Sequence, residues 1–401
     1  MNSLRNLKVI ELANVLAGPS VGQFFAELGA DVIKIENLLT KGDVTRSWKA
    51  SQEKNTGDIS AYFSSVNWGK KSVALNLQKN KAVEIVHTLV RKADIVICSY
   101  KPGDAKKYFL DYKTLSDIND KIIYGDVTGY GSNVLRSGYD AIIQAESGFT
   151  FLNGQPYGEP IKMPVALMDI LAAHQLKEGI LLALIERINT GKGCKVDVSL
   201  IQAGIASLAN QSANFLVGGF IPQRMGSDHP NIVPYGTVFK TRDEKMIVLA
   251  VGTDKQFKKL CEVLEISDIS NHPKFATNQD RVINKIELLE ILKAKISNYS
   301  KETILQKLAV VKVPAGDVKN MQEVFHEAHA KEININSGNI TGVRNNIFKM
   351  NDRFSEISLS APPHYAQHTK EVLTESLGMD EDSIFSLEKE GVIETLKYKE
   401  S

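Results

Sequence analysis

The stretch MPVALMDILAAHQLKEGILLALIERINTGKGCKVDVSL, residues 163–200, decides how the rest of the chain is interpreted. From Asp169 to Asn189 its apolar residues return at steps of three and four, which predicts the buried face of an amphipathic helix. Thr190 and Gly191 form a typical helix end. Residues 195–200 then alternate polar with apolar side chains, as a strand does. The stretch therefore predicts a helix, a glycine-rich turn and a strand, with an acid where the helix begins.

Two roles are open for that acid, Asp169. A carboxylate at a helix start faces unpaired backbone N–H groups and the positive end of the helix dipole, and both favour its ionised form. An ionised carboxylate in a partly dry site can act as a nucleophile. Asp is also among the preferred N-cap residues, so the local pattern by itself favours a capping role.

Bulk composition narrows the class of protein. The chain has 401 residues, 43% of them hydrophobic, which is enough for a large core and predicts two domains. A net charge of +1 argues against nucleic acid or a membrane surface as a partner. The chain start lacks a signal-peptide pattern, and no apolar run reaches the roughly 18 residues of a membrane helix. Cys98, Cys194 and Cys261 fit no zinc or disulfide spacing. We therefore expect a cytoplasmic protein with reduced thiols and no metal site.

The first half of the chain has the pattern of an α/β protein. Strand-like runs at 7–12, 31–36, 94–99 and 122–127 are interleaved with helical patterns at 19–28 and 81–92. Such interleaving is typical of a Rossmann-like parallel sheet with helices on its faces. The first crossover, ANVLAGP at 13–19, lacks the Gly-x-Gly-x-x-Gly fingerprint, which argues against an NAD-dependent protein.

The second half predicts a smaller domain. A helix is expected from Leu200 to about Leu216, after which Gly218, Gly219 and Pro222 mark a change in composition. A hairpin at 236–251 and helices at 254–264, 281–297 and 301–309 predict an α+β fold. We expect residues 1–224 to form the first part of a large domain, 225–330 the small domain, and 331–401 a return to the large one.

Taken together, several motifs resemble the class III CoA-transferases, the family of the formyl-CoA and carnitine CoA-transferases. They are the Asp169 stretch, the opening ELANVLAGPS, the Gly-Asp-x-x-Arg element at 42–46, NWGKKSVALNL at 67–77 and SGYDAIIQAESG at 137–148. They occur in the family's order and cover essentially the whole chain. The resemblance implies that Asp169 is the catalytic nucleophile. It also implies an interlocked homodimer, in which each chain threads a hole in the other.

The resemblance further implies that the large domain binds coenzyme A, as part of an acyl-CoA substrate, with no tightly bound cofactor. The lysine pair at 70 and 71 suits a CoA phosphate. The segment SYKPGDAKK at 99–107 departs from the family, because Ser99 and Lys101 stand where Asn and Arg are usual, so bidentate phosphate contacts become single-point ones. The expected contact positions are Leu16, Ala17, Arg46, Lys70, Lys71, Leu75, Tyr100, Lys101, Lys107 and Tyr139.

Tyr139 separates two related activities. The α-methylacyl-CoA racemases, which resemble the transferases, carry a proton-transferring His at this position, and a tyrosine, with an ordinary pKa of about 10, is a poor substitute base. The sequence thus favours a transferase, with a racemase or a non-catalytic acyl-CoA-binding Rossmann protein as alternatives. The run GSDHPNIVPYGTVFKTRDEKMIVLAVG at 226–252 looks most like the succinyl-CoA:glutarate and related dicarboxylate transferases. We therefore expect succinyl-CoA as donor and a short dicarboxylate as acceptor.

Overall fold

The structure is a computed structural model that describes residues 4–54, 57–351 and 357–396. The chain divides into two compact units: a large unit of Met1–Ser147, Pro164–Leu208 and Glu332–Ser401, and a small unit of Gly148–Met163 and Ala209–Lys331. The expected boundary at 224 therefore moves to 208, the one at 330 differs by one residue, and residues 148–163 join the small unit, which was not expected. The helix expected from Leu200 to Leu216 is broken into α9 (Leu200–Ala206) and α10 (Asn210–Leu216), and Ala209 between them has φ +48°. The chain changes unit at this break, before the glycines that suggested the boundary.

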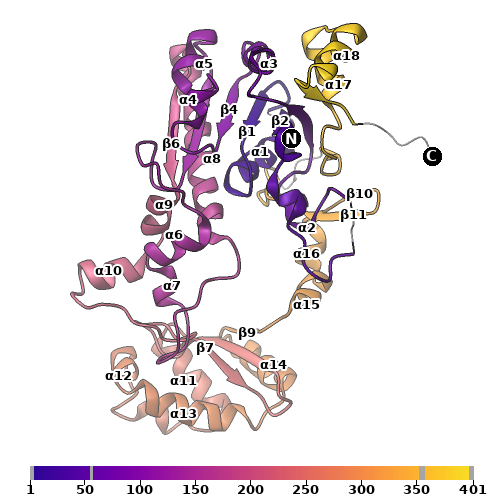
Figure 1. The fold of residues 1–401 in the computed structure, drawn as a ribbon. Coiled ribbons are helices and arrows are strands. Elements are labelled where there is room, and N and C mark those ends of the chain that lie inside the picture. Colours follow the sequence, from indigo (N-terminus) through magenta and orange to yellow (C-terminus); the bar gives the residue numbers. More distant parts are fainter. Residues whose placement is uncertain (1–3, 55–56, 352–356, 397–401) are drawn as a thin grey trace. The chain divides into compact units, whose positions relative to one another are not determined.

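The large unit contains a seven-stranded sheet in the order β12-β3-β2-β1-β4-β5-β6. All neighbours pair in parallel except β12, which lies antiparallel to β3. The predicted α/β class with a parallel sheet is confirmed (Figure 1). The strands are β1 (Lys8–Leu12), β2 (Asp31–Asn37), β3 (Lys70–Leu75), β4 (Ile95–Cys98), β5 (Ile123–Thr128), β6 (Lys195–Ser199) and β12 (Ile393–Glu394).

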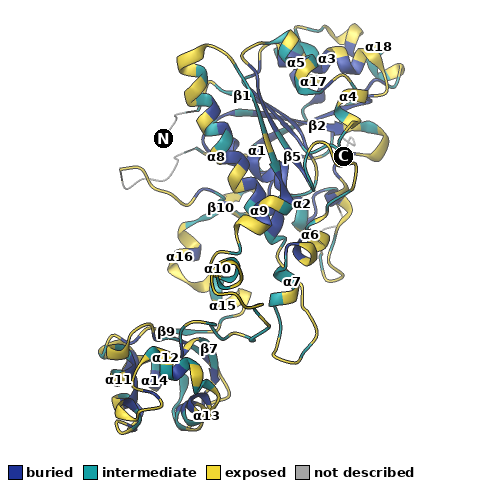
Figure 2. Ribbon diagram, turned by 90° about the vertical axis from the view of Figure 1, so that its left-hand side faces the viewer, coloured by how far each residue is buried: buried dark blue, intermediate teal, exposed yellow. Residues whose placement is uncertain are grey.

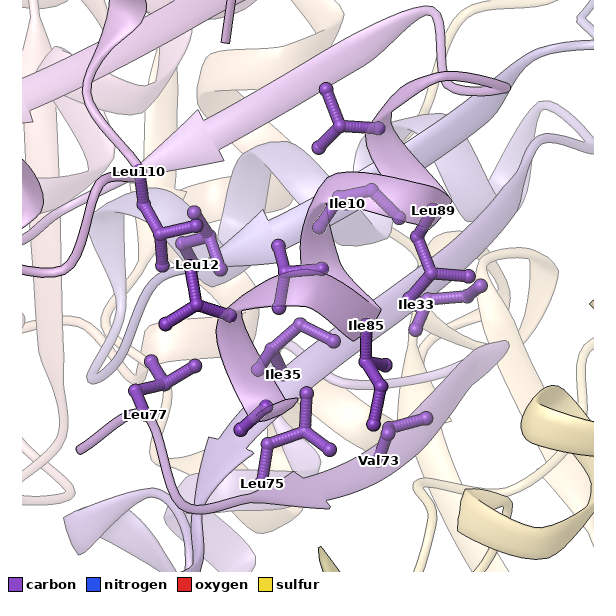
Figure 3. Packing of buried hydrophobic residues seen from close by; sticks show 14 of the residues in the cluster. Ile10, Leu12, Ile33, Ile35, Val73, Leu75, Leu77, Ile85, Leu89 and Leu110 are labelled. Carbon is purple, nitrogen blue, oxygen red and sulfur yellow. The ribbon is translucent and has the colours of Figure 1, made fainter. Parts of the chain in front are cut away.

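One face of this sheet, which we call the apolar face, is covered by α3 (Asn80–Val90), α5 (Tyr112–Ile118), α17 (Thr369–Leu377) and α18 (Glu381–Lys389). Because side chains alternate between the two faces of a strand, every second residue points toward α3. In β1, β2 and β3 these residues are Ile10, Leu12, Ile33, Ile35, Val73 and Leu75. In Figure 3, Ile85 and Leu89 of α3 lie against these strand side chains. All of them are buried, as the hydrophobic effect favours.

The opposite face is covered by α1 (Ala17–Glu27) and α8 (Leu167–Thr190). Every residue of α1 is buried, and Figure 2 shows the helix in dark blue. A side chain at Gly22 of α1 would clash with the Glu11 carboxylate of β1. A side chain at Gly125 of β5 would press on Ile180 and Leu176 of α8. Both helices therefore pack directly on the sheet. We call this the polar face, because it presents Glu11, Lys34, Glu36, Lys70 and Ser72.

Shorter elements complete the large unit. They are α2 (Ala61–Ser64), α4 (Asp104–Lys107), α6 (Asp140–Glu146), the 3-10 turns at Leu38–Thr40 and Val44–Ser47, and a hairpin of β10 (Asn334–Ser337) and β11 (Ile340–Val343). The helix α16 (Ala328–Glu332) lies where the chain returns from the small unit.

The small unit is built on an antiparallel sheet in the order β7-β8-β9, with strands Tyr235–Lys240, Met246–Ala250 and Ala315–Asp317. Its core joins Ile247 and Leu249 of β8 to Phe257 of α11 and Leu288 of α13. Its helices are α7 (Phe149–Leu152), α10, α11 (Asp254–Val263), α12 (Asn278–Ile283), α13 (Lys285–Ile296), α14 (Lys301–Val310) and α15 (Met321–His326), with a 3-10 turn at Ile269–Asn271. The expected α+β architecture is present. Within the described residues of both units, no helix is long and apolar enough to cross a membrane.

Candidate active site

Two adjoining pockets lie at the carboxyl ends of the parallel strands in the large unit. The larger, of about 840 Å³, is lined by the end of β2 at Asn37 and by residues that follow β2 and β3, among them Gly42, Leu77 and Gln78. The smaller, of about 380 Å³, is lined by residues that follow β1, β4 and β5, and by Asp169. Both pockets share Asn14, Val44, Tyr100 and Asp104. Open α/β sheets bind their ligands at this edge, so the two pockets together form a candidate ligand cleft.

Asp169 is one of the acids that line the cleft. It is the third residue of α8, whose N-cap residue Ala166 makes no side-chain hydrogen bond to the helix. Its side chain is 8% exposed and lines the smaller pocket. Among the residues that the structure describes, none donates a hydrogen bond to its carboxylate or forms an ion pair with it. The capping role that the local pattern favoured is therefore wrong.

The electrostatics of Asp169 also differ from the expectation. Burial, and then the nearby charge of Asp140, raise the pKa of Asp169 to about 7. A helix start was expected to favour the ionised form, but loss of water outweighs the helix dipole when no N–H group reaches the carboxylate. A carboxyl group in this state is about half ionised near neutral pH. Such perturbed groups in clefts are candidates for chemistry.

Asp140, which the sequence did not single out, belongs to the same site. It is the first residue of α6, and its Oδ1 accepts a hydrogen bond of 2.8 Å from the backbone N–H of Met168 at the start of α8. Its Oδ2 accepts one of 2.8 Å from Nε2 of Gln144. Asp140 thus fixes α6 to the helix that carries Asp169. The signal for it was its place in the motif at 137–148, directly after Tyr139.

Five of the expected contact positions meet around the smaller pocket with Asp169: Leu16, Ala17, Tyr100, Lys101 and Tyr139. Leu16 and Ala17 begin α1. Tyr100 lines the larger pocket as well, and burial raises its pKa above the ordinary value. Tyr139 is 58% exposed and precedes α6. In the loop that carries Tyr139, the backbone of Gly138 packs directly against that of Gly129, and neither position has room for a side chain.

Arg46 and Lys70 need correction as ligand contacts. Arg46 lines the larger pocket, but its guanidinium binds Glu36 in a bidentate pair, with Nε–Oε1 at 2.8 Å and Nη2–Oε2 at 2.6 Å. Lys70 is buried on the polar face, where its Nζ lies 2.7 Å from Oε2 of Glu11 and 2.8 Å from the carbonyl of Pro19. Both cations are already paired inside the protein, so neither has a free charge for a phosphate or carboxylate.

Lys71, Leu75 and Lys107 also lie away from the cleft. Lys71 is the second residue of β3, at the opposite edge of the sheet, and pairs with Asp31 at 3.5 Å and Glu371 at 3.1 Å. Leu75 is buried in the core of the apolar face. Lys107 ends α4 with its Nζ 5.5 Å from the ring centre of Tyr108, outside both pockets.

The cleft offers other cations in place of these lysines. Lys41 and Lys49 line the larger pocket and Lys101 the smaller one. Lys41 pairs with Glu394, and Lys49 donates to the carbonyl of Gly57 at 2.5 Å. These are solvent-facing interactions that a phosphate can replace at little cost. In the part of the chain that the structure describes, no group of three or more His, Cys, Asp or Glu side chains could hold a metal ion.

Comparisons with known proteins identify the family. Residues 4–369 match CoA-transferase family III. The chain is 39% identical over 330 residues to the succinate–glutarate CoA-transferase of Agrobacterium fabrum, covering 80% of this chain and 81% of that protein. It is 33% identical over 405 residues to the succinyl-CoA:glutarate CoA-transferase of Homo sapiens, covering 98% and 90%.

Solved structures agree with the sequence relatives. The crystal structure of a CaiB/BaiF family protein from Brucella suis superposes with a TM-score of 0.81 at 37% identity and covers 93% of this chain and 99% of that one. The family match spans most of the sequence, and relatives above 30% identity span most of it too. The chain therefore belongs to CoA-transferase family III.

Proposed function

We propose that this enzyme moves coenzyme A from succinyl-CoA to a short dicarboxylic acid through a covalent intermediate on Asp169. Membership of CoA-transferase family III supports the reaction type. The names of the relatives, succinate–glutarate and succinyl-CoA:glutarate CoA-transferase, support the substrate class. The observation that carries the proposal is the buried, unpaired carboxyl group of Asp169, with its raised pKa, at the wall of a pocket.

In this proposal the two pockets divide the acyl-CoA between them. The nucleotide occupies the larger pocket, against Leu77 and Tyr108, with Lys41 and Lys49 near its phosphates. The pantetheine arm passes Tyr100, which lines both pockets, and brings the thioester into the smaller pocket beside Asp169. Apolar walls with a few charged groups are typical of cofactor-sized sites.

The chemistry needs one nucleophile. The Asp169 carboxylate attacks the thioester carbonyl, the C–S bond breaks, and a mixed anhydride and CoA thiolate form. The thiolate attacks the aspartyl carbonyl, which releases succinate and leaves an aspartyl-CoA thioester. The acceptor carboxylate then attacks this thioester and again expels the thiolate. Attack of the thiolate on the acceptor carbonyl gives the new acyl-CoA and restores Asp169, so no metal and no tightly bound cofactor takes part.

The surroundings of Asp169 suit this sequence. Its burial keeps water away from the anhydrides, which would otherwise hydrolyse. A carboxylate with few hydrogen bonds is also more basic than a solvated one, and therefore a stronger nucleophile. Only the ionised form attacks, so transfer should rise with pH through about 7, the pKa of Asp169.

Trapping of the intermediate tests the proposal. Incubation with succinyl-CoA and hydroxylamine should convert Asp169 to a hydroxamate, detected by mass spectrometry of the peptide that contains it. Asp169→Asn should lose transfer by about a thousandfold or more. Its melting temperature at pH 8 should be no lower than that of the wild type, because the ionised carboxylate in this dry site opposes folding above pH 7.

A matched control is Asp126→Asn. Asp126 of β5 is another carboxyl group whose pKa burial raises, but it pairs with Lys195 at 3.0 Å and lies outside both pockets. This variant should keep transfer. Normal activity of Asp169→Asn with its amide intact would reject the mechanism. Exchange of an α-proton in deuterated water without any acceptor acid would instead indicate a racemase.

The proposal includes a homodimer in the cytoplasm, interlocked as the family resemblance implies. Apolar side chains support a partner surface in the small unit, at the end of α10 and in the segment after it. They are exposed by 54% to 88% at Phe215, Leu216 and Val217, with Phe220 and Ile221 also exposed. Burial of such a patch against a second copy is what the hydrophobic effect favours. Light scattering on the purified protein should give the mass of two chains, and a single-chain mass would reject the dimer. Cell fractionation tests the location.

A further inference from the structure

The turn between β1 and α1 has a strained backbone. Asn14, Val15, Leu16 and Ala17 form part of the wall of the smaller pocket, where Asp169 also lies. Val15 has φ +71°, in the left-handed region. A β-branched residue is a genuine outlier there, because its side chain crowds the backbone. Such strain persists only where the surroundings hold it in place, and it is most often found at functional sites.

Asp43 is the group that holds this turn. The backbone N–H of Val15 donates to both carboxylate oxygens of Asp43, at 3.3 Å to Oδ1 and 3.2 Å to Oδ2. The same carboxylate accepts hydrogen bonds from Thr45, at 3.0 Å from its N–H and 2.8 Å from its hydroxyl. The Asp43 side chain is buried, and its own backbone N–H donates to Glu36 at 2.8 Å. Asp43 is therefore fixed from several sides.

Lys34 of the polar face completes the arrangement. Its Nζ lies 3.0 Å from Oδ2 of Asp43 and 3.0 Å from Oε1 of Glu11. It also donates to the carbonyl of Ala13 at 2.6 Å. One ammonium group thus holds the start of the turn directly and its middle through Asp43. Burial raises the pKa of Asp43, but the Lys34 charge and the Thr45 hydrogen bonds outweigh it and leave the pKa below the ordinary value.

We propose that Asp43 is a positioning residue for the acyl-CoA, which holds Val15 in its left-handed conformation and so sets Leu16 and Ala17 at the wall of the smaller pocket. The ligand in this statement rests on the function proposed above. A direct role for Asp43 in binding the ligand is excluded by its contacts. Both carboxylate oxygens are already occupied by Val15, Thr45 and Lys34, and a carboxylate would repel the CoA phosphates.

Asp43→Asn tests the role, because the amide keeps the size of the side chain but turns an NH₂ group toward either Lys34 or the Val15 N–H. We expect KM for succinyl-CoA to rise about tenfold and kcat to change less than about threefold. The matched control is Asp94→Asn. Asp94 also accepts a backbone N–H, from Lys8 at 2.9 Å, and pairs with Arg187 at 3.0 Å, but it lies outside the cleft. The control should lose less stability, because its ion pair is partly exposed, and KM should not change.

A second variant separates positioning from stability. Glycine adopts φ +71° without strain, so Val15→Gly should remove the need for the Asp43 contact. In the double variant Asp43→Asn with Val15→Gly, KM should return to within about threefold of that of Val15→Gly alone. If Asp43 acted on KM other than through the conformation of Val15, KM would stay high in the double variant. That result, or a rise in KM for the Asp94→Asn control equal to that for Asp43→Asn, would overturn the proposal.

Hydrogen exchange gives a readout that does not depend on activity. The peptide that contains Val15, Leu16 and Ala17 should exchange its amide hydrogens at least about tenfold faster in Asp43→Asn than in the wild type, both without ligand. Unchanged exchange would overturn the proposal even if transfer fell. If the wild type transferred no CoA but the exchange rates changed as expected, the proposed function would fail while the hold of Asp43 on the turn would stand.

Discussion

The two faces of the large sheet are both covered by helices but are chemically opposite. On the apolar face, Ile10 of β1 and Ile33 of β2 pack against Leu89 of α3 (Figure 3). On the polar face, the next residues along the same strands, Glu11 and Lys34, form an ion pair with no exposure to solvent. The apolar face is stabilised by contacts between apolar side chains, and other apolar side chains of similar volume could make such contacts. The polar face is held by specific pairs, so it can fix the conformation of a particular loop.

The charges of the polar face pair with one another and with two charges from the segment after β2, Asp43 and Arg46. Three acids, Glu11, Glu36 and Asp43, face three cations, Lys34, Lys70 and Arg46, all buried. A buried ion pair adds little net stability, since desolvation offsets the attraction, but breaking one partner is costly. The network reaches the turn at Val15 and, through Arg46, the carbonyl of Pro363. It therefore ties the wall of the cleft to the sheet and to the returning end of the chain.

The largest effect is expected from breaking the polar face. Glu11→Gln leaves Lys34 and Lys70 without their shared carboxylate. The free energy of unfolding should fall by about 3–5 kcal/mol, measured by urea denaturation. Glu84→Gln, on the exposed side of α3, should change it by less than about 0.5 kcal/mol. A loss below about 1 kcal/mol for Glu11→Gln would show that the network is not a set of interdependent charges.

Truncation on the apolar face should cost somewhat less and leave the cleft intact. Leu89→Ala removes a buried side chain of α3, and we expect a loss of about 3 kcal/mol in the free energy of unfolding. KM for succinyl-CoA should stay at the wild-type value at temperatures where the variant is folded. A raised KM in steady-state assays would mean that the apolar face also positions the cleft.

Removal of the Asp140 charge should lower the pKa of Asp169. Asp140→Asn keeps an oxygen that can accept from the Met168 N–H but removes the negative charge, which is the second cause of the raised pKa. The midpoint of the pH–rate profile should therefore fall from about 7 toward the ordinary value of 3.8, without reaching it because burial remains. Transfer at pH 6 should accordingly make up a larger fraction of the maximum. A midpoint that stayed fixed or rose would exclude this coupling.

The smallest effect is expected at the edge of the sheet remote from the cleft. Lys71→Met removes two partly exposed ion pairs, to Asp31 and Glu371, and should change the free energy of unfolding by less than about 1 kcal/mol. The dissociation constant for CoA in calorimetry should be unchanged. Weaker binding of CoA than of dephospho-CoA by this variant would restore Lys71 as a contact to the 3′-phosphate.

The sequence by itself determined the elements and the order in which they follow. The period of two in residues 195–200 predicted the strand β6, and the period of 3.6 in residues 169–189 predicted α8 and placed Asp169 in its first turn, because both signals depend only on local spacing. The resemblance to the class III CoA-transferases supplied the expected contact positions, of which Leu16, Ala17, Tyr100, Lys101 and Tyr139 line one pocket.

Only the tertiary structure decided what covers each face and which charges meet. Alternation shows that Lys70 and Lys71 point to opposite sides of β3, but not that α1 buries the first and that Asp31 and Glu371 pair with the second. The direction of the pKa shift of Asp169 depends on burial and on Asp140, which lies 29 residues earlier in the sequence. Local patterns are set by neighbours along the chain, whereas desolvation and Coulomb interactions act through space, so they exist only once the fold has formed.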